Sequence, residues 1–231
     1  MKNADFEYYY NNVPGKGKCR NNLIYTSLIS KDRKIFCKWF YNDKVYHNNQ
    51  NEVVDASLMD LKWHKEIEFL SFMSQKYPQH VPKIIDVDYS NKKIYLSIQG
   101  VDLWEQSNCS GRNYKQIIPD WEDQMLEILQ CYKEAGFFKY SLHPSSYFIE
   151  NGKLKSINYF FCYWHNENEI CVNDVLSHIS QERQQQLFQK MQELNILSTD
   201  KKSFKDFQIL ALESFRSNYN DSFIKKAQEI F

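Results

Sequence analysis

The first hundred residues alternate between short apolar runs and polar stretches, a pattern that predicts a small sheet. Residues 23–29 and 35–40 are expected to be strands, and the polar residues 30–34 between them have the length of a hairpin connection. The asparagine-rich stretch 42–55 then predicts a loop.

One helix is predicted to cross this sheet over residues 56–75. Its apolar residues recur at steps of four, four and three, which places them on one helix face: Met59, Trp63, Ile67 and Leu70. Pro78 and Pro82 end the helix, and two further strands, joined by a short polar connection, are predicted over residues 83–88 and 92–98.

The pattern beyond Gly100 predicts a long helix. Asp120 is expected to cap its start and Gly136 to end it, because these residue types are favoured at the two helix termini. Its buried stripe is expected to contain Trp121, Met125, Ile128 and Tyr132.

The rest of the chain is predicted to hold one hairpin and two helices. Asn151-Gly152 is a strong hairpin signal and joins strands expected over residues 147–149 and 154–161. Helices are expected over residues 180–194 and 203–216. In the first helix, the side chains expected to face the core are Leu187, Met191 and Leu194. The second helix begins with a capping-box-like pair, Ser203 and Asp206.

Composition adds several exclusions. The 231 residues carry 29 Lys and Arg against 29 Asp and Glu, so a neutral chain is not expected to bind nucleic acid or anionic membranes through phosphates. No stretch approaches the roughly 20 apolar residues of a membrane helix, and the first residues lack the apolar core of a signal peptide. We therefore expect a cytoplasmic protein, in the host cytoplasm if the chain is viral.

Aromatic residues and cysteines narrow the class further. The 16 Tyr, 16 Phe and 5 Trp supply large surfaces for burial, which argues against a disordered chain. The six cysteines form no C-x-x-C pair and no close Cys/His cluster, so we expect free buried thiols and no metal site.

Lys38 is unusual because it lies in the middle of an apolar strand. Alternation places it on the same face as Phe36 and Phe40, where an ammonium group needs an anion because an unpaired buried charge is costly. Glu66 flanks the packed face of the predicted helix, three residues after Trp63. The two side chains predict an ion pair between sheet and helix. Two simpler interpretations stay open: a lysine that guards a strand edge or extends to solvent, and an ordinary surface glutamate.

The order of these elements resembles the protein-kinase-like fold. A glycine-bearing turn at residues 14–18, two strands with a central lysine, a helix with a glutamate, a hairpin, a long helix and a second hairpin follow one another as in that fold. Residues 81–88 and 94–103 resemble its fourth and fifth strands and hinge. Residues 136–149 and 152–159 resemble the catalytic loop and metal-binding strand of small bacterial and phage kinase-like proteins of the aminoglycoside and lipopolysaccharide kinase types.

The chain keeps the frame of that motif and changes its chemical groups. The family pattern is H-x-D-L-H-P-x-N, a hydrophobic run, a turn, and I-D-F or I-D-W. Here Lys139 takes the place of the His and Ser141 that of the catalytic Asp. Ser146 takes the place of the metal-binding Asn, and Asn158 that of the magnesium-binding Asp. The resemblance covers residues 13–165.

These substitutions imply a degenerate member of the family, a pseudokinase. Phosphoryl transfer needs positioned phosphates, magnesium and an Asp that receives the hydroxyl proton. A serine at position 141 cannot act as that base near neutral pH, and losing a base typically costs about 10²- to 10⁴-fold in rate. Ser146 and Asn158 remove both protein anchors for the metal, although the Asn158 amide oxygen could still touch a cation. We therefore assign no residue as catalytic, and we expect no metal ligand and no Mg²⁺ cofactor.

Nucleotide binding is left open by the resemblance. Lys38 and Glu66 match the family's phosphate-orienting pair, and the basic turn around Gly15 and Gly17 could offer backbone amides to a phosphate. That turn departs from the family's G-x-G-x-x-G. ATP is thus a candidate ligand, with these four residues as its binding residues.

Other polar residues are expected to have structural or surface roles. His143 is expected to shape the loop, and His165 to be a loop residue. Four aspartates could in principle substitute for the missing acids, but the default expectation is a surface position for each: Asp86, Asp88, Asp102 and Asp174.

The sequence therefore predicts an α+β protein with the kinase-like two-lobe architecture. The N-lobe, residues 1–100, would hold the small antiparallel sheet, and the reduced C-lobe, residues 101–231, would be mainly helical. The first functional hypothesis is a pseudokinase that binds an unidentified protein partner, with nucleotide as a second candidate ligand. The second is an atypical ATP-dependent phosphotransferase or nucleotidyl transferase. The third is a pure interaction scaffold with a closed nucleotide cleft.

Overall fold

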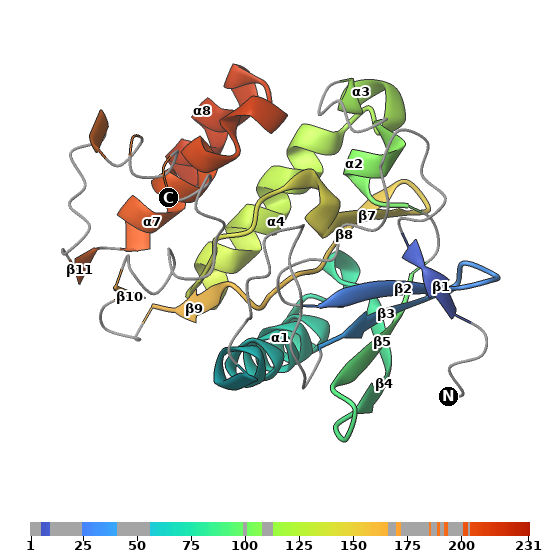
Figure 1. Cartoon of the computed structure of the whole chain (residues 1–231). Coiled ribbons are helices and arrows are strands. Elements are labelled where there is room, and N and C mark those ends of the chain that lie inside the picture. Colours follow the sequence, from blue (N-terminus) through green and yellow to red (C-terminus); the bar gives the residue numbers. More distant parts are fainter. Residues whose placement is uncertain are drawn as a thin grey trace.

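The structure of the chain is a computed structural model that combines α-helices with a mainly antiparallel sheet (Figure 1). It describes residues 6–9, 25–40, 56–98, 101–107, 113–165, 170–171, 201–202 and 204–231, with the single positions 185, 189 and 192–193. Three residues of the predicted chemistry lie outside these ranges: Gly15, Gly17 and Asp174.

Five antiparallel strands form the largest sheet, in the order β1-β2-β3-β5-β4. The two predicted hairpins are confirmed as β2–β3 and β4–β5. The edge strand β1 was not predicted, because three residues carry too little alternation to be recognised. The strands are β1 (Phe6–Tyr8), β2 (Thr26–Ser30), β3 (Ile35–Trp39), β4 (Lys83–Asp88) and β5 (Lys93–Ser97).

The helix predicted over residues 56–75 is α1 (Ala56–Lys76), which lies against one face of this sheet (Figure 1). Trp63 and Leu70 are buried as predicted. Glu66 lies on the same buried face and is fully enclosed, so it is not a surface glutamate. The helix ends just before the 3₁₀ turn η3 (Pro78–His80), because proline cannot continue it.

The elements that follow residue 100 are called the second half here, and those before it the first half. The central helix of the second half is α4 (Trp121–Ala135), and Gly136 ends it in a left-handed conformation with φ 77°. The predicted stripe is buried: Trp121, Met125, Ile128 and Tyr132. The predicted side-chain cap is wrong. Asp120 is the N-cap residue, but its ψ of 24° is far from the extended conformation that aims a cap at the backbone, and its carboxylate accepts from Gln124 Nε2 instead.

The hairpin predicted around Asn151-Gly152 is formed by β7 (Tyr147–Glu150) and β8 (Lys153–Ser156). Both turn residues have positive φ, 52° and 73°, as a two-residue hairpin turn of this kind requires. The second strand was expected to reach residue 161, and this is wrong. The chain turns at Asn158, whose φ of 68° leaves the strand conformation.

The remaining elements complete the second half. β6 (Phe137–Lys139) pairs with β9 (Cys162–Trp164), and α7 (Phe204–Ser214) corresponds to the predicted last helix. A further helix, α8 (Asp221–Ile230), was not predicted; it packs on α4 and α7 (Figure 1). The short elements are α2 (Leu103–Gln106), α3 (Tyr114–Ile117), η4 (Pro144–Ser146), η5 (Arg216–Asn218), β10 (Ile170–Cys171) and β11 (Lys201–Lys202).

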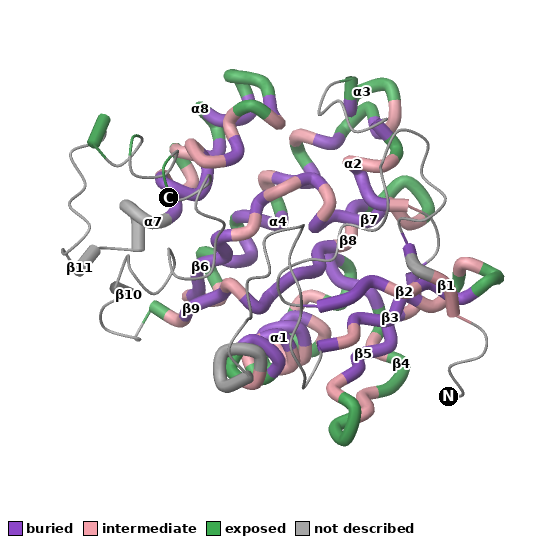
Figure 2. Tube along the Cα trace, viewed as in Figure 1, coloured by how far each residue is buried: buried purple, intermediate pink, exposed green. Residues whose placement is uncertain are grey.

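One continuous core joins the two halves. Buried residues run from the strands β2, β3 and β5 through β7 and β8 into α4 (Figure 2). Three described cysteines are buried free thiols, as predicted: Cys37, Cys131 and Cys162. Of the predicted helix 180–194, positions 185, 189 and 192–193 are helical, and its inward residues lie outside the described chain. No helix in the described ranges is long and apolar enough to cross a membrane.

Candidate functional site

Lys38 is the centre of the candidate site. It lies opposite Ser27 and Ile94 within the sheet, and its side chain is fully buried. Its Nζ donates to Glu66 Oε1 at 2.6 Å and to Asn158 Oδ1 at 2.9 Å. The predicted ion pair is therefore present, and it faces Asn158. The two simpler interpretations, an edge lysine and a surface glutamate, are both wrong.

Aromatic rings enclose the rest of the ammonium group. Nζ lies 4.3 Å from the ring centroid of Tyr25, 5.1 Å from that of Phe160 and 5.7 Å from that of Phe40. These distances are within the range of cation–π attraction. We call the contact between the sheet face that carries Lys38 and the residues facing it from the second half the internal interface. On the sheet it contains Phe36, Lys38 and Phe40, and opposite them Phe148, Asn158 and Phe160.

Asn158 connects Lys38 to the other degenerate positions. Its Oδ1 also accepts a hydrogen bond from the Tyr25 hydroxyl at 2.6 Å, and its Nδ2 donates to Ser146 Oγ at 3.0 Å. Ser146 Oγ lies 3.3 Å from Ser141 Oγ. The left-handed backbone at position 158 suits asparagine, which tolerates this conformation better than most residues. Asn158 and Ser146 thus form a hydrogen-bonded chain that starts at Lys38, and the longer 3.3 Å contact places Ser141 beyond it.

The residues around Asn158 do not fit magnesium in this arrangement. Magnesium is held by oxygen ligands, mainly carboxylates and phosphates. The amide oxygen of Asn158 already accepts two hydrogen bonds, one from the Lys38 ammonium and one from Tyr25. Glu66 Oε1 is used by Lys38 as well. Among the described residues, no group of three His, Cys, Asp or Glu side chains is arranged to hold a metal ion.

Burial dominates the electrostatics of Lys38. Loss of solvent lowers its pKa to about 8, and the nearby Glu66 carboxylate opposes this shift. The second carboxylate oxygen, Glu66 Oε2, is buried and has no hydrogen-bond partner within the described part of the chain. Lys38 and Glu66 therefore form a buried ion pair, and the groups that bond the Lys38 ammonium, Glu66 and Asn158, belong to this chain.

Lys139, which takes the place of the family's histidine, is also fully buried. Its Nζ donates to the backbone carbonyl of Ser141 and lies 5.4 Å and 5.7 Å from the ring centroids of Tyr147 and Tyr159. Burial lowers the pKa of Lys139 to about 8; the nearby Cys162 and Glu66 oppose this shift, and the Lys38 charge adds to it. Only its apolar neighbours Phe137 and Phe138 indicate this burial in the sequence.

His143 has the structural role that was expected of it. Its Nδ1 lies 2.8 Å from Ser145 Oγ and accepts from the Ser145 backbone N–H at 3.2 Å, which fixes the turn η4. Its ring lies against Trp104 and Phe215, with centroid distances of 4.9 Å and 5.9 Å. The imidazole thus joins α2, the loop and the residue that follows α7.

Asp102 contradicts the expectation of a surface carboxylate, because it is completely buried. It caps α2 by accepting from the Glu105 N–H at 2.8 Å, and it accepts from the Tyr9 hydroxyl at 3.0 Å. A buried carboxylate with these donors is satisfied as an N-cap. It lies at the end of the segment that the family resemblance matches to the hinge.

The other predicted acids and His165 lie away from Lys38. Asp86 and Asp88 are on the edge strand β4, where Asp88 accepts from Asn91 in the following turn. His165 is exposed, and its backbone N–H donates to the Gly136 carbonyl. Asp86 is exposed and Asp88 half-buried on that strand, so both are surface acids.

Sequence reasoning missed Tyr9 and Tyr25, the two residues that fill the internal interface. Alternation along the strand could have placed Tyr25 on the sheet face of Lys38. Residues 25, 27 and 29 share one face, and Ser27 lies directly opposite Lys38. Tyr9 had no such signal, since the strand before it was not recognised. Their hydrogen-bond partners lie 93 and 133 residues further along the chain, a distance that no local pattern records.

Comparisons with known proteins give the following similarities. No protein-family model matches the chain, and no curated protein matches it. A high-resolution crystal structure of WbdD has a TM-score of 0.47 and 14% identity over 84% of this chain and 43% of its own. A medium-resolution structure of the bifunctional kinase-methyltransferase WbdD has a TM-score of 0.44 and 14% identity over 84% and 42%. A low-resolution structure of WbdD has a TM-score of 0.43 and 15% identity, and the match covers 61% of this chain and 27% of that one. The chain spans less than half the length of these structures.

Proposed function

We propose that this chain is a catalytically degenerate protein of the kinase-like fold, with an N-lobe over residues 1–100 and a C-lobe over residues 101–231. Support comes from the element order and from the Lys38–Glu66 pair, which joins the sheet to α1 as the resemblance implies. Ser141, Ser146 and Asn158 replace the groups that phosphoryl transfer needs.

The observation that carries the proposal is the enclosure of Lys38. Its ammonium group is completely buried, and its hydrogen bonds go to Glu66 and Asn158. In a phosphotransferase this charge would have to face a phosphate. Here the aromatic ring of Tyr25 lies over it instead. The arrangement favours the third hypothesis, an interaction scaffold with a closed cleft, over nucleotide binding by Lys38, Glu66, Gly15 and Gly17.

The protein would then act by binding another protein rather than by chemistry. None of the three candidate aspartates that the structure describes is placed to replace the missing base: Asp102 is used as a helix cap, and Asp86 and Asp88 lie on the far edge strand. This weighs against the second hypothesis, an atypical phosphotransferase or nucleotidyl transferase.

A transfer assay tests the proposal. Full-length protein is incubated with radiolabelled ATP and either magnesium or manganese, with a generic protein substrate and without one. We expect no label on the substrate or on the chain itself. Label that appears with the wild type and disappears in Lys38→Met would overturn the proposal, because it would show that Lys38 contacts a reacting phosphate. A thermal-shift titration with ATP and with ADP is expected to leave Tm unchanged.

A further inference from the structure

Tyr9 and Tyr25 enter the internal interface from the N-terminal part of the chain. Tyr9 directly follows β1 and Tyr25 directly precedes β2, and their exposed fractions are 1% and 2%. In the β1–β2 register Glu7 lies opposite Ile29, so Tyr9, two residues later, shares the sheet face of Lys38. Two tyrosines from neighbouring strands therefore point into the same contact.

Tyr9 fills the end of the interface next to Asp102. Its hydroxyl donates to Asp102 Oδ2 and accepts from the Asp102 backbone N–H, both at 3.0 Å. Its ring lies edge-on to Phe36 at 5.3 Å and 5.6 Å from Phe148, so it is held by aromatic residues of both halves. The Arg33 guanidinium lies 5.9 Å from the ring.

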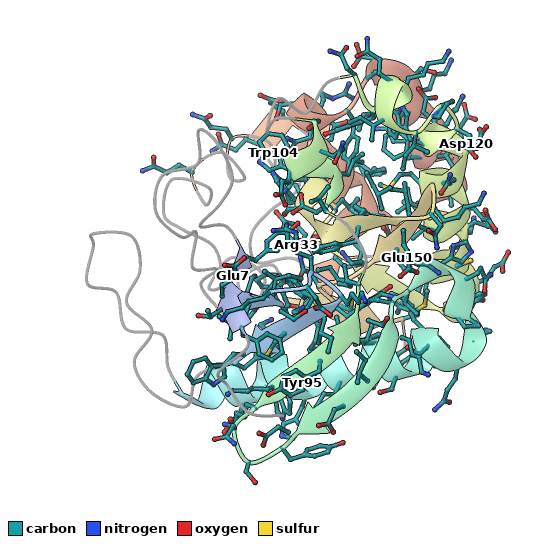
Figure 3. All side chains as sticks on the ribbon, turned by 90° about the vertical axis from the view of Figure 1, so that its right-hand side faces the viewer. Glu7, Arg33, Tyr95, Trp104, Asp120 and Glu150 are labelled. Atoms are coloured by element: carbon teal, nitrogen blue, oxygen red, sulfur yellow. The ribbon has the colours of Figure 1, made fainter. Side chains whose placement is uncertain are left out.

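The outer side of this end is closed as well. Figure 3 shows Arg33 and Trp104 on the same side of the molecule, where the turn after β2 approaches α2. Arg33 Nη2 lies 3.8 Å from Glu105 Oε1, across that approach. Tyr9 is thus covered by an ion pair between the sheet and the second half.

Tyr25 fills the other end, next to Asn158. Its hydroxyl donates to Asn158 Oδ1 at 2.6 Å, and its ring lies over the Lys38 ammonium group at 4.3 Å. Phe40 and Phe160 pack against the same ring at 5.5 Å and 5.6 Å. The tyrosine supplies both a hydrogen bond to the amide and an aromatic face to the cation.

These contacts differ from those of an ordinary core tyrosine. Each hydroxyl bonds a polar side chain of the opposite half, and each ring is clamped between aromatic rings of both halves. Loss of either hydroxyl is costly, because it leaves buried Asp102 or Asn158 with one hydrogen-bond donor fewer. Each tyrosine therefore supplies, from within the chain, a second donor to a buried oxygen-bearing group of the opposite half.

We infer that Tyr9 and Tyr25 are built-in ligands of the internal interface, which keep it closed by inserting their own phenol rings. This inference rests on the proposed function and deepens it, because it names the side chains that close the site. It also gives the class of molecule that can replace them. A small phenol fits, since each ring is surrounded by aromatic faces and each hydroxyl meets one carboxylate or amide oxygen.

The test replaces Tyr25 by alanine in the full chain and adds 4-methylphenol, which has the shape of the missing side chain. A buried cavity lined by apolar groups can bind a small aromatic molecule. We expect 4-methylphenol to raise the Tm of Tyr25→Ala by roughly 2 to 4 °C, with no rise for the wild type. Benzene, which lacks the hydroxyl, is expected to raise it less.

Acylation of lysines by acetic anhydride, followed by peptide mass spectrometry, measures the closure directly. In the wild type, Lys38 is expected to react at least roughly tenfold more slowly than the exposed Lys153, because a buried amine reacts only after opening. Tyr25→Ala is expected to speed the reaction of Lys38 about tenfold, and 4-methylphenol to reverse this. Lys139, whose side chain contacts the Ser141 carbonyl and the rings of Tyr147 and Tyr159, reports on wider opening of the core and should stay protected.

Three controls separate the outcomes. Tyr25→Phe keeps the ring, so Lys38 should stay protected; if Tyr25→Ala unfolds and Lys139 reacts too, Tyr25→Leu replaces it in the same assays. In Tyr9→Ala, 4-methylphenol should raise the Tm, but acylation of Lys38 should not become faster.

Two results would overturn the inference and leave the absence of phosphoryl transfer untouched. One is rapid acylation of Lys38 in the wild type, and the other is a folded variant whose Tm does not change with 4-methylphenol. Lys38-dependent transfer would overturn the proposed function instead.

Discussion

Lys38 and Lys139 are both fully buried, and burial lowers the pKa of each to about 8, but their surroundings differ. Lys38 donates to the Glu66 carboxylate and the Asn158 amide. Lys139 donates to the backbone carbonyl of Ser141, and among the described residues no carboxylate lies within salt-bridge distance of it. One cation has a paired anion and the other has a neutral acceptor with two tyrosine rings.

The two lysines show two different consequences of losing the catalytic groups. At Lys38 the polar groups that remain have become partners of one another, so the ion pair now joins the sheet, α1 and the second half. At Lys139 a cation occupies the position of a histidine. Glu66 is near enough to oppose the lowering of its pKa, but among the described residues no carboxylate lies within salt-bridge distance of it. A buried charge without an anion destabilises the folded state. We therefore expect Lys38 to stabilise the fold and Lys139 to oppose it.

The largest expected effect comes from breaking the Lys38 pair. Lys38→Met leaves the Glu66 carboxylate buried without its cation, and removing one partner of a buried pair typically costs about 3–5 kcal/mol. The free energy of unfolding, measured by urea titration, should fall by this amount. The double variant Lys38→Met/Glu66→Met should recover most of the loss, because no charge is then left unpaired.

Lys153→Met is the matched control for that experiment. Lys153 is an exposed lysine on β8, and its nearest carboxylate, Asp120, is 4.0 Å away. Surface substitutions of this kind usually change stability by less than about 0.5 kcal/mol. A loss for Lys38→Met no larger than that of Lys153→Met would contradict the assignment of Lys38 as a structural ion-pair residue.

Lys139→Met is expected to change stability in the opposite direction. Methionine fills a similar volume with no charge to bury, and replacing buried charge by apolar groups has stabilised other proteins by about 1–4 kcal/mol. The loss of the hydrogen bond to the Ser141 carbonyl offsets part of this gain, so we expect an increase of about 1–2 kcal/mol in the free energy of unfolding. A decrease would show that the Lys139 charge has a partner and would remove the contrast with Lys38.

The sheet and hairpins could be predicted because their signals are local. The strand around Lys38 and the turn at Asn151-Gly152 depend on alternation and on residues next to one another in sequence, and both are present. The Lys38–Glu66 pair followed from a physical requirement, that a buried cation needs an anion, once strand and helix faces were assigned.

The parts that could not be predicted depend on distant contacts. Tyr9 and Tyr25 gain their roles from Asp102 and Asn158, whose positions are known only when the two halves are assembled. The pair β6–β9 joins two three-residue strands too short for a periodic signal. The turn at Asn158 was missed for a related reason, because an apolar run does not reveal a single residue with positive φ.

The pH dependence of stability offers a third, smaller test of the contrast. In the unfolded chain Lys139 keeps its proton up to its ordinary pKa of 10.5, whereas in the folded state burial lowers this pKa to about 8. Between these values the unfolded state binds more protons, so the contribution of Lys139 to stability rises with pH. Between pH 7 and pH 9 we expect a rise of about 1 kcal/mol.

The difference between wild type and Lys139→Met isolates this contribution. Urea titrations at pH 7, 8 and 9 should show the stabilising effect of Lys139→Met shrinking as pH rises, because the wild-type lysine becomes neutral. The range ends near pH 9 because buried tyrosines such as Tyr132, whose pKa burial raises well above 10, add an opposite dependence at higher pH. A gap between the two proteins that is constant over the range would show that Lys139 does not change its charge there.

The smallest expected effect concerns the two serines that link the regions. Ser146 Oγ accepts from the buried Asn158 amide at 3.0 Å, so Ser146→Ala leaves a buried donor without its acceptor and should lower the free energy of unfolding by about 1 kcal/mol. Ser141 Oγ has only a 3.3 Å contact with Ser146, and Ser141→Ala should lower it by less than about 0.5 kcal/mol. Equal losses would mean that the hydrogen-bonded chain from Lys38 extends fully to the former catalytic position, whereas the expected inequality places its end at Ser146.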